Sequence, residues 1–100
     1  MIQCKINGIV HILKVLISKY DKCEGLKKYN FLPANQGVIF VYDKDDESKY
    51  DFSEIGYDCK IYFLNSDFSI IHQEKTSAYQ DKLVSCAEPF RYVIEIGGKN

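Results

Sequence analysis

The sequence PFRYVIEIGG at residues 89–98 decides the fold, because it holds the clearest strand pattern in the chain. Side chains of a β-strand point alternately to its two faces. The two alternating sets here are Tyr92, Ile94 and Ile96 on one face, and Arg91, Val93 and Glu95 on the other. This alternation predicts a half-buried strand over Arg91–Ile96, with the first set facing the core.

Two hairpins are predicted elsewhere in the chain. Asn7-Gly8 favours the positive φ angles of a type I′ turn and joins predicted strands at Ile2–Ile6 and Ile9–Ile17. The apolar runs at 60–64 and 68–72 flank a short polar turn, which indicates a second hairpin.

The remaining segments give weaker patterns. Val38–Tyr42 is a compact apolar run typical of a buried strand, and we expect the acidic residues 43–47 to end it. The polar residues 73–80 predict a loop, whereas residues 81–87 fit either a helical turn or a strand.

One helix is predicted over Lys19–Tyr29. Ser18 precedes Asp21 by three positions, which is a weak capping pattern. Gly25 interrupts the helix, because a glycine inside a helix costs about 1 kcal/mol relative to alanine. It indicates either close packing on a strand or an early helix end. The predicted buried face contains Tyr20, Cys23 and Leu26.

The order of these segments resembles a known family. It is a strand, a helix with Gly25-Leu26, a loop at Leu32-Pro33, a strand at Gly37–Tyr42 and a strand at Tyr92–Ile96. This order resembles the domain of unknown function family 192 over about residues 9–98. The resemblance implies one α+β, mostly β domain over residues 1–100, a small antiparallel β barrel or sandwich with one short helix packed on it. No activity is established for that family, so the resemblance implies architecture and little else.

The central signature of that family differs in this chain. The family has Met, Asn and Thr followed by Pro, Leu and Asp, whereas residues 52–60 read FSEIGYDCK. If the signature residues form a ligand or catalytic site, the resemblance implies that this chain has lost it. The chain ends at Asn100, soon after Gly97-Gly98, which implies a shortened and divergent member of the family.

The composition excludes several classes of protein. With 46% hydrophobic residues in 100, the chain has enough apolar surface for one core. Its net charge of -1 comes from 13 basic and 14 acidic side chains spread along the sequence, so no nucleic-acid partner is predicted. No signal segment or membrane span is visible, and we expect a soluble protein of the cytoplasm or of a virion, without a membrane partner.

An acidic stretch gives the sharpest pattern for a cofactor. Its members have the spacing of ligands in a twelve-residue calcium loop: Asp43, Asp45, Glu47, Asp51 and Glu54. However, Ser48 occupies the position at which such a loop needs glycine, and a strand rather than a helix precedes it. The stretch is either a divalent-cation site, with Ca²⁺ as the candidate, or a solvated loop between strands. No other cofactor is predicted.

The cysteines and histidines give no catalytic motif. His11 and His72 lie in predicted strands, where a histidine is more often a packed or surface residue than a general base. A Cys-His pair assembled by the fold is the weaker alternative, and we predict that the chain is not an enzyme. The cysteines lack zinc or redox spacing, and they are either buried hydrophobic residues or partners in two disulfides: Cys4, Cys23, Cys59 and Cys86.

Aromatic residues are more numerous than one small core usually holds, with eight Tyr and six Phe. Because Tyr combines apolar area with a hydrogen-bonding tip, it is favoured at interfaces. We predict a contact surface that is made by Tyr50, Phe52, Tyr57 and Asp58. The alternative is that these rings cover the open end of a small barrel.

The sequence therefore favours a non-enzymatic interaction or assembly module on a β scaffold, which binds a protein partner or further copies of itself. One form is a structural or accessory component of a phage particle, since the chain is rich in Lys, Ile, Asn and Tyr, as AT-rich genomes tend to encode. The alternative is a domain that binds a small ligand or a divalent cation at the acidic loop or at a barrel mouth.

Overall fold

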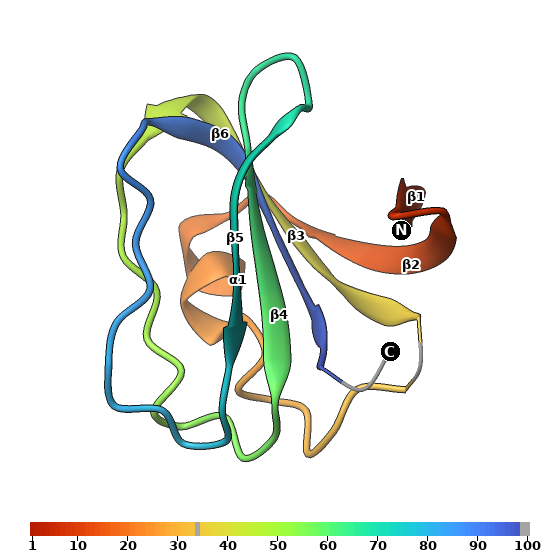
Figure 1. The fold of residues 1–100 in the computed structure, drawn as a ribbon, viewed down its shortest axis with the longest axis vertical. Coiled ribbons are helices and arrows are strands. Elements are labelled where there is room, and N and C mark those ends of the chain that lie inside the picture. The colour runs from red at the N-terminus through yellow and green to blue at the C-terminus, as the bar shows by residue number, and fades with distance from the viewer. Residues whose placement is uncertain (34, 99–100) are drawn as a thin grey trace.

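Six strands form one mixed sheet in the computed structural model, which describes residues 1–33 and 35–98 (Figure 1). Their order across the sheet is β1-β2-β3-β6-β4-β5, so β1 and β5 are its edges. β2 and β3 run parallel, and the other neighbouring pairs are antiparallel. The predicted α+β, mostly β fold is confirmed, and the sheet stays open rather than closing into a barrel. The strands are β1 (Ile2–Ile6), β2 (Ile9–Leu16), β3 (Gln36–Asp46), β4 (Cys59–Leu64), β5 (Ile70–Thr76) and β6 (Phe90–Gly97).

Both predicted hairpins are present. Asn7 and Gly8 have φ angles of 51° and 83°, as the type I′ turn between β1 and β2 requires. The second hairpin joins β4 and β5, but β5 continues to Thr76. The prediction of a loop over 73–80 is therefore wrong in its first half, because backbone pairing with β4 holds these polar residues in the sheet.

β3 is also longer than predicted. It continues through the acidic residues to Asp46, which pairs with Phe90 of β6 after an irregularity in the register. The prediction that the acidic run ends this strand is wrong, because strand pairing depends on the backbone and the charged side chains can point to solvent. Residues 81–87 form no regular element, but Val84 makes an isolated bridge with Tyr50.

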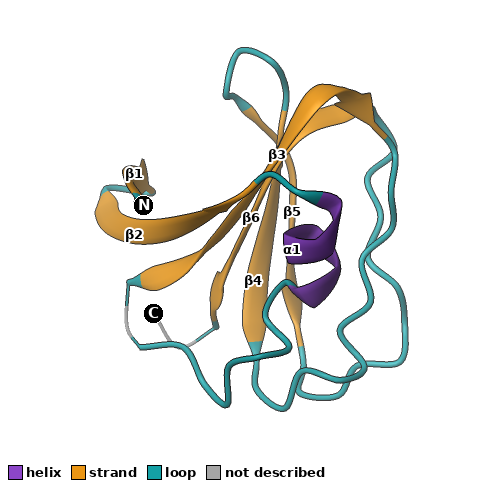
Figure 2. Cartoon of the chain, turned by 180° about the vertical axis from the view of Figure 1, so that it is seen from behind, coloured by secondary structure: helices purple, strands orange, loops and turns teal. Residues whose placement is uncertain are grey.

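The helix α1 (Lys19–Glu24) lies on one face of the sheet (Figure 2). Its start agrees with the prediction, since the Ser18 hydroxyl accepts a hydrogen bond of 3.0 Å from the Asp21 N–H. It ends at Gly25, so the early-end alternative is the correct one and the predicted extension to Tyr29 is wrong. The helix buries none of its own residues, so the prediction that Tyr20 and Cys23 lie on a buried face is wrong. Leu26, which follows the helix, is buried as predicted.

Apolar side chains form a core on each face of the sheet. In β6, Val93 lies in the core under α1 and Ile94 lies in the core on the opposite face. The prediction that this strand is half-buried is therefore wrong, because both of its faces are covered. The larger core also receives residues from the segments 48–58 and 77–89, which run over the sheet beside α1: Tyr50, Phe52, Ile55 and Val84. Within the part of the chain that the structure describes, no helix has the length and apolar character that crossing a membrane requires.

Candidate functional site

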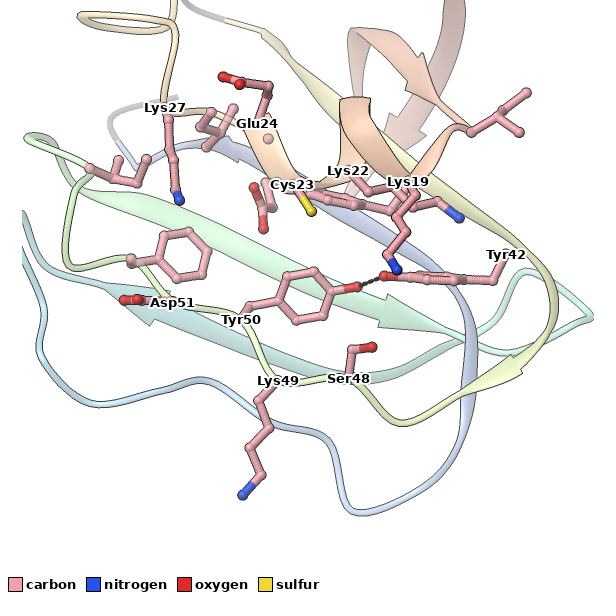
Figure 3. Close-up of a pocket in the computed structure, with 17 residues that line it drawn as sticks. Lys19, Lys22, Cys23, Glu24, Lys27, Tyr42, Ser48, Lys49, Tyr50 and Asp51 are labelled. Carbon is pink, nitrogen blue, oxygen red and sulfur yellow. Dashed lines mark hydrogen bonds between the residues drawn. The ribbon is translucent and has the colours of Figure 1, made fainter.

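A pocket of about 530 Å³ lies between α1, β3 and the segment that carries residues 48–55, and we call it the α1 pocket (Figure 3). Its walls include apolar residues from both sides, such as Leu26 and Ile55. Its lining also includes the aromatic residues Phe40, Tyr42, Tyr50 and Phe52, the lysines Lys19, Lys22, Lys27 and Lys49, and the acids Glu24, Asp51 and Glu95.

Glu95 is the buried acid of this pocket. It lies in the central strand β6, where its cross-strand neighbours are Val38 of β3 and Ile61 of β4. Both neighbours are at most 1% exposed, and Glu95 itself is 4% exposed. The sequence predicts the correct alternation for this strand, but it places Glu95 on the polar face. That placement is wrong because α1 and the segment 48–58 cover this face.

The carboxyl of Glu95 has no partner among the described residues. Within residues 1–33 and 35–98, no hydrogen bond or ion pair joins it to another group. Burial disfavours the charged form and raises the pKa of Glu95 to about 8. At neutral pH the group is therefore mostly a neutral carboxylic acid, which can donate one hydrogen bond and accept others.

The end of α1 leaves room above this carboxyl. Gly25 has φ 49° and ψ -124°, a conformation that residues other than glycine rarely adopt. A Cβ atom at this position would lie 3.5 Å from the Phe40 ring and 4.0 Å from Glu95 Oε1. A larger side chain at position 25 would therefore reach into the space beside Glu95.

Two tyrosines form a polar pair on the aromatic wall. The hydroxyl groups of Tyr42 and Tyr50 are hydrogen-bonded to each other, as Figure 3 shows. The Tyr50 ring packs edge-on against Phe40 and Phe63, with ring centroids 5.3 and 5.7 Å away. Burial raises the pKa of both tyrosines, so both remain neutral over the physiological range.

Two lysines that line the α1 pocket, Lys19 and Lys22, have no carboxylate partner among the described residues. The pocket is also lined by Lys27 and Lys49 and by the acids Glu24 and Asp51. The Lys22 ammonium lies 3.9 Å from the centroid of the Tyr42 ring, and the Lys27 ammonium lies 3.2 Å from a carboxylate oxygen of Glu54. Lys49 points away from the other labelled side chains in Figure 3. An approaching ligand thus meets cations first and the neutral Glu95 at depth.

The predicted contact surface is not assembled at the surface. Tyr50 and Phe52 are 8% and 2% exposed and line the α1 pocket. Tyr57 is half-buried, and its hydroxyl donates a hydrogen bond of 3.5 Å to the Leu26 carbonyl oxygen. Only Asp58 is exposed, and its Oδ1 accepts a hydrogen bond of 3.0 Å from the Ala78 N–H. The rings cover the core instead, because the bridge between Tyr50 and Val84 holds this segment against the sheet.

The five acids predicted as calcium ligands do not come together. Among the described residues, no group of three or more His, Cys, Asp or Glu side chains could hold a metal ion. The loop spacing fails because β3 extends through Asp46 and spreads Asp43, Asp45 and the exposed Glu47 along the chain. Three of the acids have other partners. The Asp45 carboxylate forms an ion pair of 3.1 Å with Arg91, and the Glu54 carboxylate forms one with Lys27. Asp51 accepts a hydrogen bond of 2.8 Å from the Ser53 N–H.

The histidines and cysteines lie apart from the α1 pocket, except for Cys23. His11 is buried, with Nδ1 2.9 Å from the Ile9 carbonyl oxygen, and His72 Nε2 lies 2.9 Å from Glu74 Oε2. All four cysteines are free thiols. Burial raises the pKa of the Cys59 thiol to about 12, so this cysteine behaves as a small hydrophobic residue. The prediction of buried cysteines holds for Cys59 alone, because Cys4 and Cys86 are partly exposed and Cys23 is exposed.

Comparisons with known proteins identify the family. The chain has the fold of a protein of unknown function from Novosphingobium aromaticivorans DSM 12444, with a TM-score of 0.82 and 18% identity over 96% of this chain and 71% of that chain. It is also similar to a protein from Sinorhizobium meliloti 1021 described as a "putative transcription regulator", with a TM-score of 0.77 and 17% identity over 95% of this chain and 76% of that chain. A search of the curated proteins finds no match. The sequence pattern of the DUF192 family, described as "Uncharacterized ACR", matches residues 2–99, and the chain therefore belongs to that family.

Proposed function

We propose that this protein binds a small molecule in the α1 pocket. The observation that carries the proposal is the Glu95 carboxyl, which lines the pocket, is buried and has no partner in the described protein. Among the described residues, Arg91 Nε is fully enclosed without a hydrogen-bond partner and the Glu95 oxygens are not, so the Glu95 oxygens open into the pocket that they line. A bound molecule can therefore reach the carboxyl and supply its hydrogen-bond partner.

The surroundings of Glu95 support the same function. Small-molecule sites are usually concave, about 300–1,000 Å³ in volume and mostly apolar, with a few convergent polar groups. The α1 pocket has a volume in this range, four aromatic side chains in its walls and the hydrogen-bonded hydroxyls of Tyr42 and Tyr50 beside Glu95. The alternative that the sequence leaves open, a ligand-binding domain, is thus better supported by the geometry than a contact surface at residues 50–58.

Amide chemical shifts in two-dimensional NMR would test the proposal directly. We would titrate the protein with four probes that share one ring: benzoate, phenyl phosphate, benzylamine and benzyl alcohol. At least one probe at millimolar concentration is expected to shift the amides of Gly25, Phe40 and Glu95, while the amide of Glu74 on the edge strand β5 serves as the internal control. If all four leave the pocket amides unmoved, the proposed function is rejected.

A second candidate is self-association through β1, which would keep the predicted assembly role and its phage form. β1 is a sheet edge, and the exposed apolar side chains of the β1–β2 hairpin are Ile2, Ile9, Val10 and Ile12, each 39–48% exposed. An exposed apolar strand edge can pair with a second copy. Light scattering over a range of concentrations is expected to give a dimer that Val10→Lys disrupts, and a monomer at all concentrations would remove this candidate.

A further inference from the structure

If the α1 pocket binds a small molecule, as proposed above, the groups at its depth and at its mouth define the chemistry of that molecule. Glu95 supplies a hydrogen-bond donor among apolar neighbours. Lys19 and Lys22, which have no carboxylate partner among the described residues, supply positive charge at the mouth, whereas Lys27 is already paired with Glu54. The two features attract different parts of one ligand, because they lie at different depths.

The separation of these features follows from the electrostatics of Glu95. Burial is the cause of its raised pKa, and no cation among the described residues lowers that pKa. A lysine close to the carboxyl would favour its charged form and hold the pKa down. Among the described residues, no ion pair joins a lysine ammonium to the Glu95 carboxyl. A negative charge placed beside Glu95 would therefore have no cation to compensate it.

We propose that the α1 pocket binds an organic acid with an uncharged oxygen acceptor, such as a ketone, at the end opposite its acid group. The ketone oxygen accepts a hydrogen bond from the Glu95 carboxyl, and the acid group lies among the lysines of the mouth. The rings of Phe40 and Phe52 contact the apolar part between them. The positive mouth disfavours ligands whose only charge is positive, although a buried acid and aromatic rings alone would suit a cation.

This arrangement predicts that binding depends on the protonation of Glu95. The other titratable groups around it come from each packed element: Tyr42 on β3, Tyr50 and Tyr57 on the segment 48–58, Cys59 on β4, and Lys22, Cys23, Glu24 and Lys27 beside Gly25. Burial raises the pKa of the tyrosines and of Cys59, so all four keep their protons at the pH at which Glu95 loses its own. Deprotonation of Glu95 removes the donor and turns an oxygen lone pair toward the ligand.

The test compares two matched probes by isothermal titration calorimetry. 4-Acetylbenzoate has a ketone opposite its carboxylate, and 4-ethylbenzoate has the same shape without the oxygen. At about pH 6.5 the ketone probe is expected to bind about tenfold more tightly, the value of one good hydrogen bond. At about pH 9.5 this advantage should vanish, because Glu95 no longer donates. Equal affinities at about pH 6.5 would overturn the inference.

Three variants separate the roles of the residues. Glu95→Gln keeps an N–H donor and cannot ionise, so the ketone advantage is expected to persist at both pH values; a loss of the advantage with pH in this variant would assign the effect to another group. Lys22→Gln is expected to weaken both probes about equally, because Lys22 lines the pocket without a carboxylate partner among the described residues. Lys82→Gln, outside the pocket, should change neither. Equal effects of the two lysine substitutions would contradict the placement of the acid group.

The outcome also distinguishes this inference from the proposed function. If benzylamine or benzyl alcohol shifts the pocket amides and the two acetyl and ethyl probes do not bind, the pocket is a ligand site and the inference about its ligand is rejected. If no probe of any class binds, both are rejected. Should Glu95→Gln fail to fold, the comparison of the two probes in the unmodified protein still decides the role of the donor.

Discussion

Replacement of Glu95 by glutamine should change how the stability of the protein depends on pH. In the folded state the pKa of Glu95 is about 8, against an ordinary value of 4.5. Between these pH values the folded protein holds a proton that the unfolded chain has released, and stability falls wherever the folded state binds more protons. The contribution of Glu95 is therefore fully present below about pH 4.5, falls as the pH rises, and is lost above about pH 8.

The size of the effect follows from the same two values. A pKa difference of 1 between the folded and unfolded states corresponds to about 1.4 kcal/mol. The pKa of Glu95 rises from 4.5 to about 8, so the free energy of unfolding should fall by up to about 5 kcal/mol between these pH values. The substitution Glu95→Gln removes this titration while keeping nearly the same side-chain shape. The variant should match the unmodified protein near pH 4.5 and be several kcal/mol more stable above pH 8.

Urea denaturation at a series of pH values from about 5 to 9 would measure this difference. Other acids also titrate, so the quantity of interest is the free energy of unfolding of the variant minus that of the unmodified protein. Glu88→Gln is the matched control, since Glu88 is exposed, and its difference should stay constant with pH. If the difference for Glu95→Gln is equally flat, the carboxyl of Glu95 is not buried in neutral form and the reasoning about the α1 pocket is refuted.

Three further predictions test the geometry around the site. Cys23 is exposed and should react with a thiol reagent in the native protein, whereas Cys59 should react only after denaturation, and mass spectrometry of peptides would reveal native labelling of Cys59 if this is wrong. Gly25→Ala should destabilise the protein by about 1–3 kcal/mol in urea, because of its φ of 49°, and unchanged stability would contradict that backbone conformation. Phe63→Ala, at a fully buried position, should cost about 3–5 kcal/mol, whereas Phe31→Ala, at a position that is 67% exposed, should cost less than about 0.5 kcal/mol, and similar costs would argue against this core.

The parts of the fold that depend on local sequence could be predicted. Asn7-Gly8 sets the turn of the first hairpin because both residues tolerate positive φ. Ser18 sets the start of α1 because its side chain can cap the helix. The alternation over Arg91–Ile96 sets which side chains share a face, and the structure agrees with that division.

The parts that depend on distant segments could not be predicted. β5 and β3 continue into polar and acidic residues because neighbouring strands pair with their backbones, and no local pattern reports such a neighbour. Tyr50 and Phe52 stand in a polar stretch that resembles a surface loop, yet the bridge to Val84 turns their rings inward. The alternation in the sequence predicts which side chains of β6 share a face. It does not indicate that α1 covers the face that carries Glu95.

The position of Glu95 favours a binding role over a purely structural one. Its cross-strand neighbours Val38 and Ile61 are buried aliphatic residues, and a third aliphatic residue between them would pack without any desolvated polar group. Self-association through β1 needs no acid at this place, because that edge is separated from β6 by β2 and β3. A ligand in the α1 pocket does need one if the acid supplies its hydrogen-bond donor. Residues that reduce stability at a ligand site are common where binding requires them, and Glu95 fits that pattern because its carboxyl faces the pocket without a partner among the described residues.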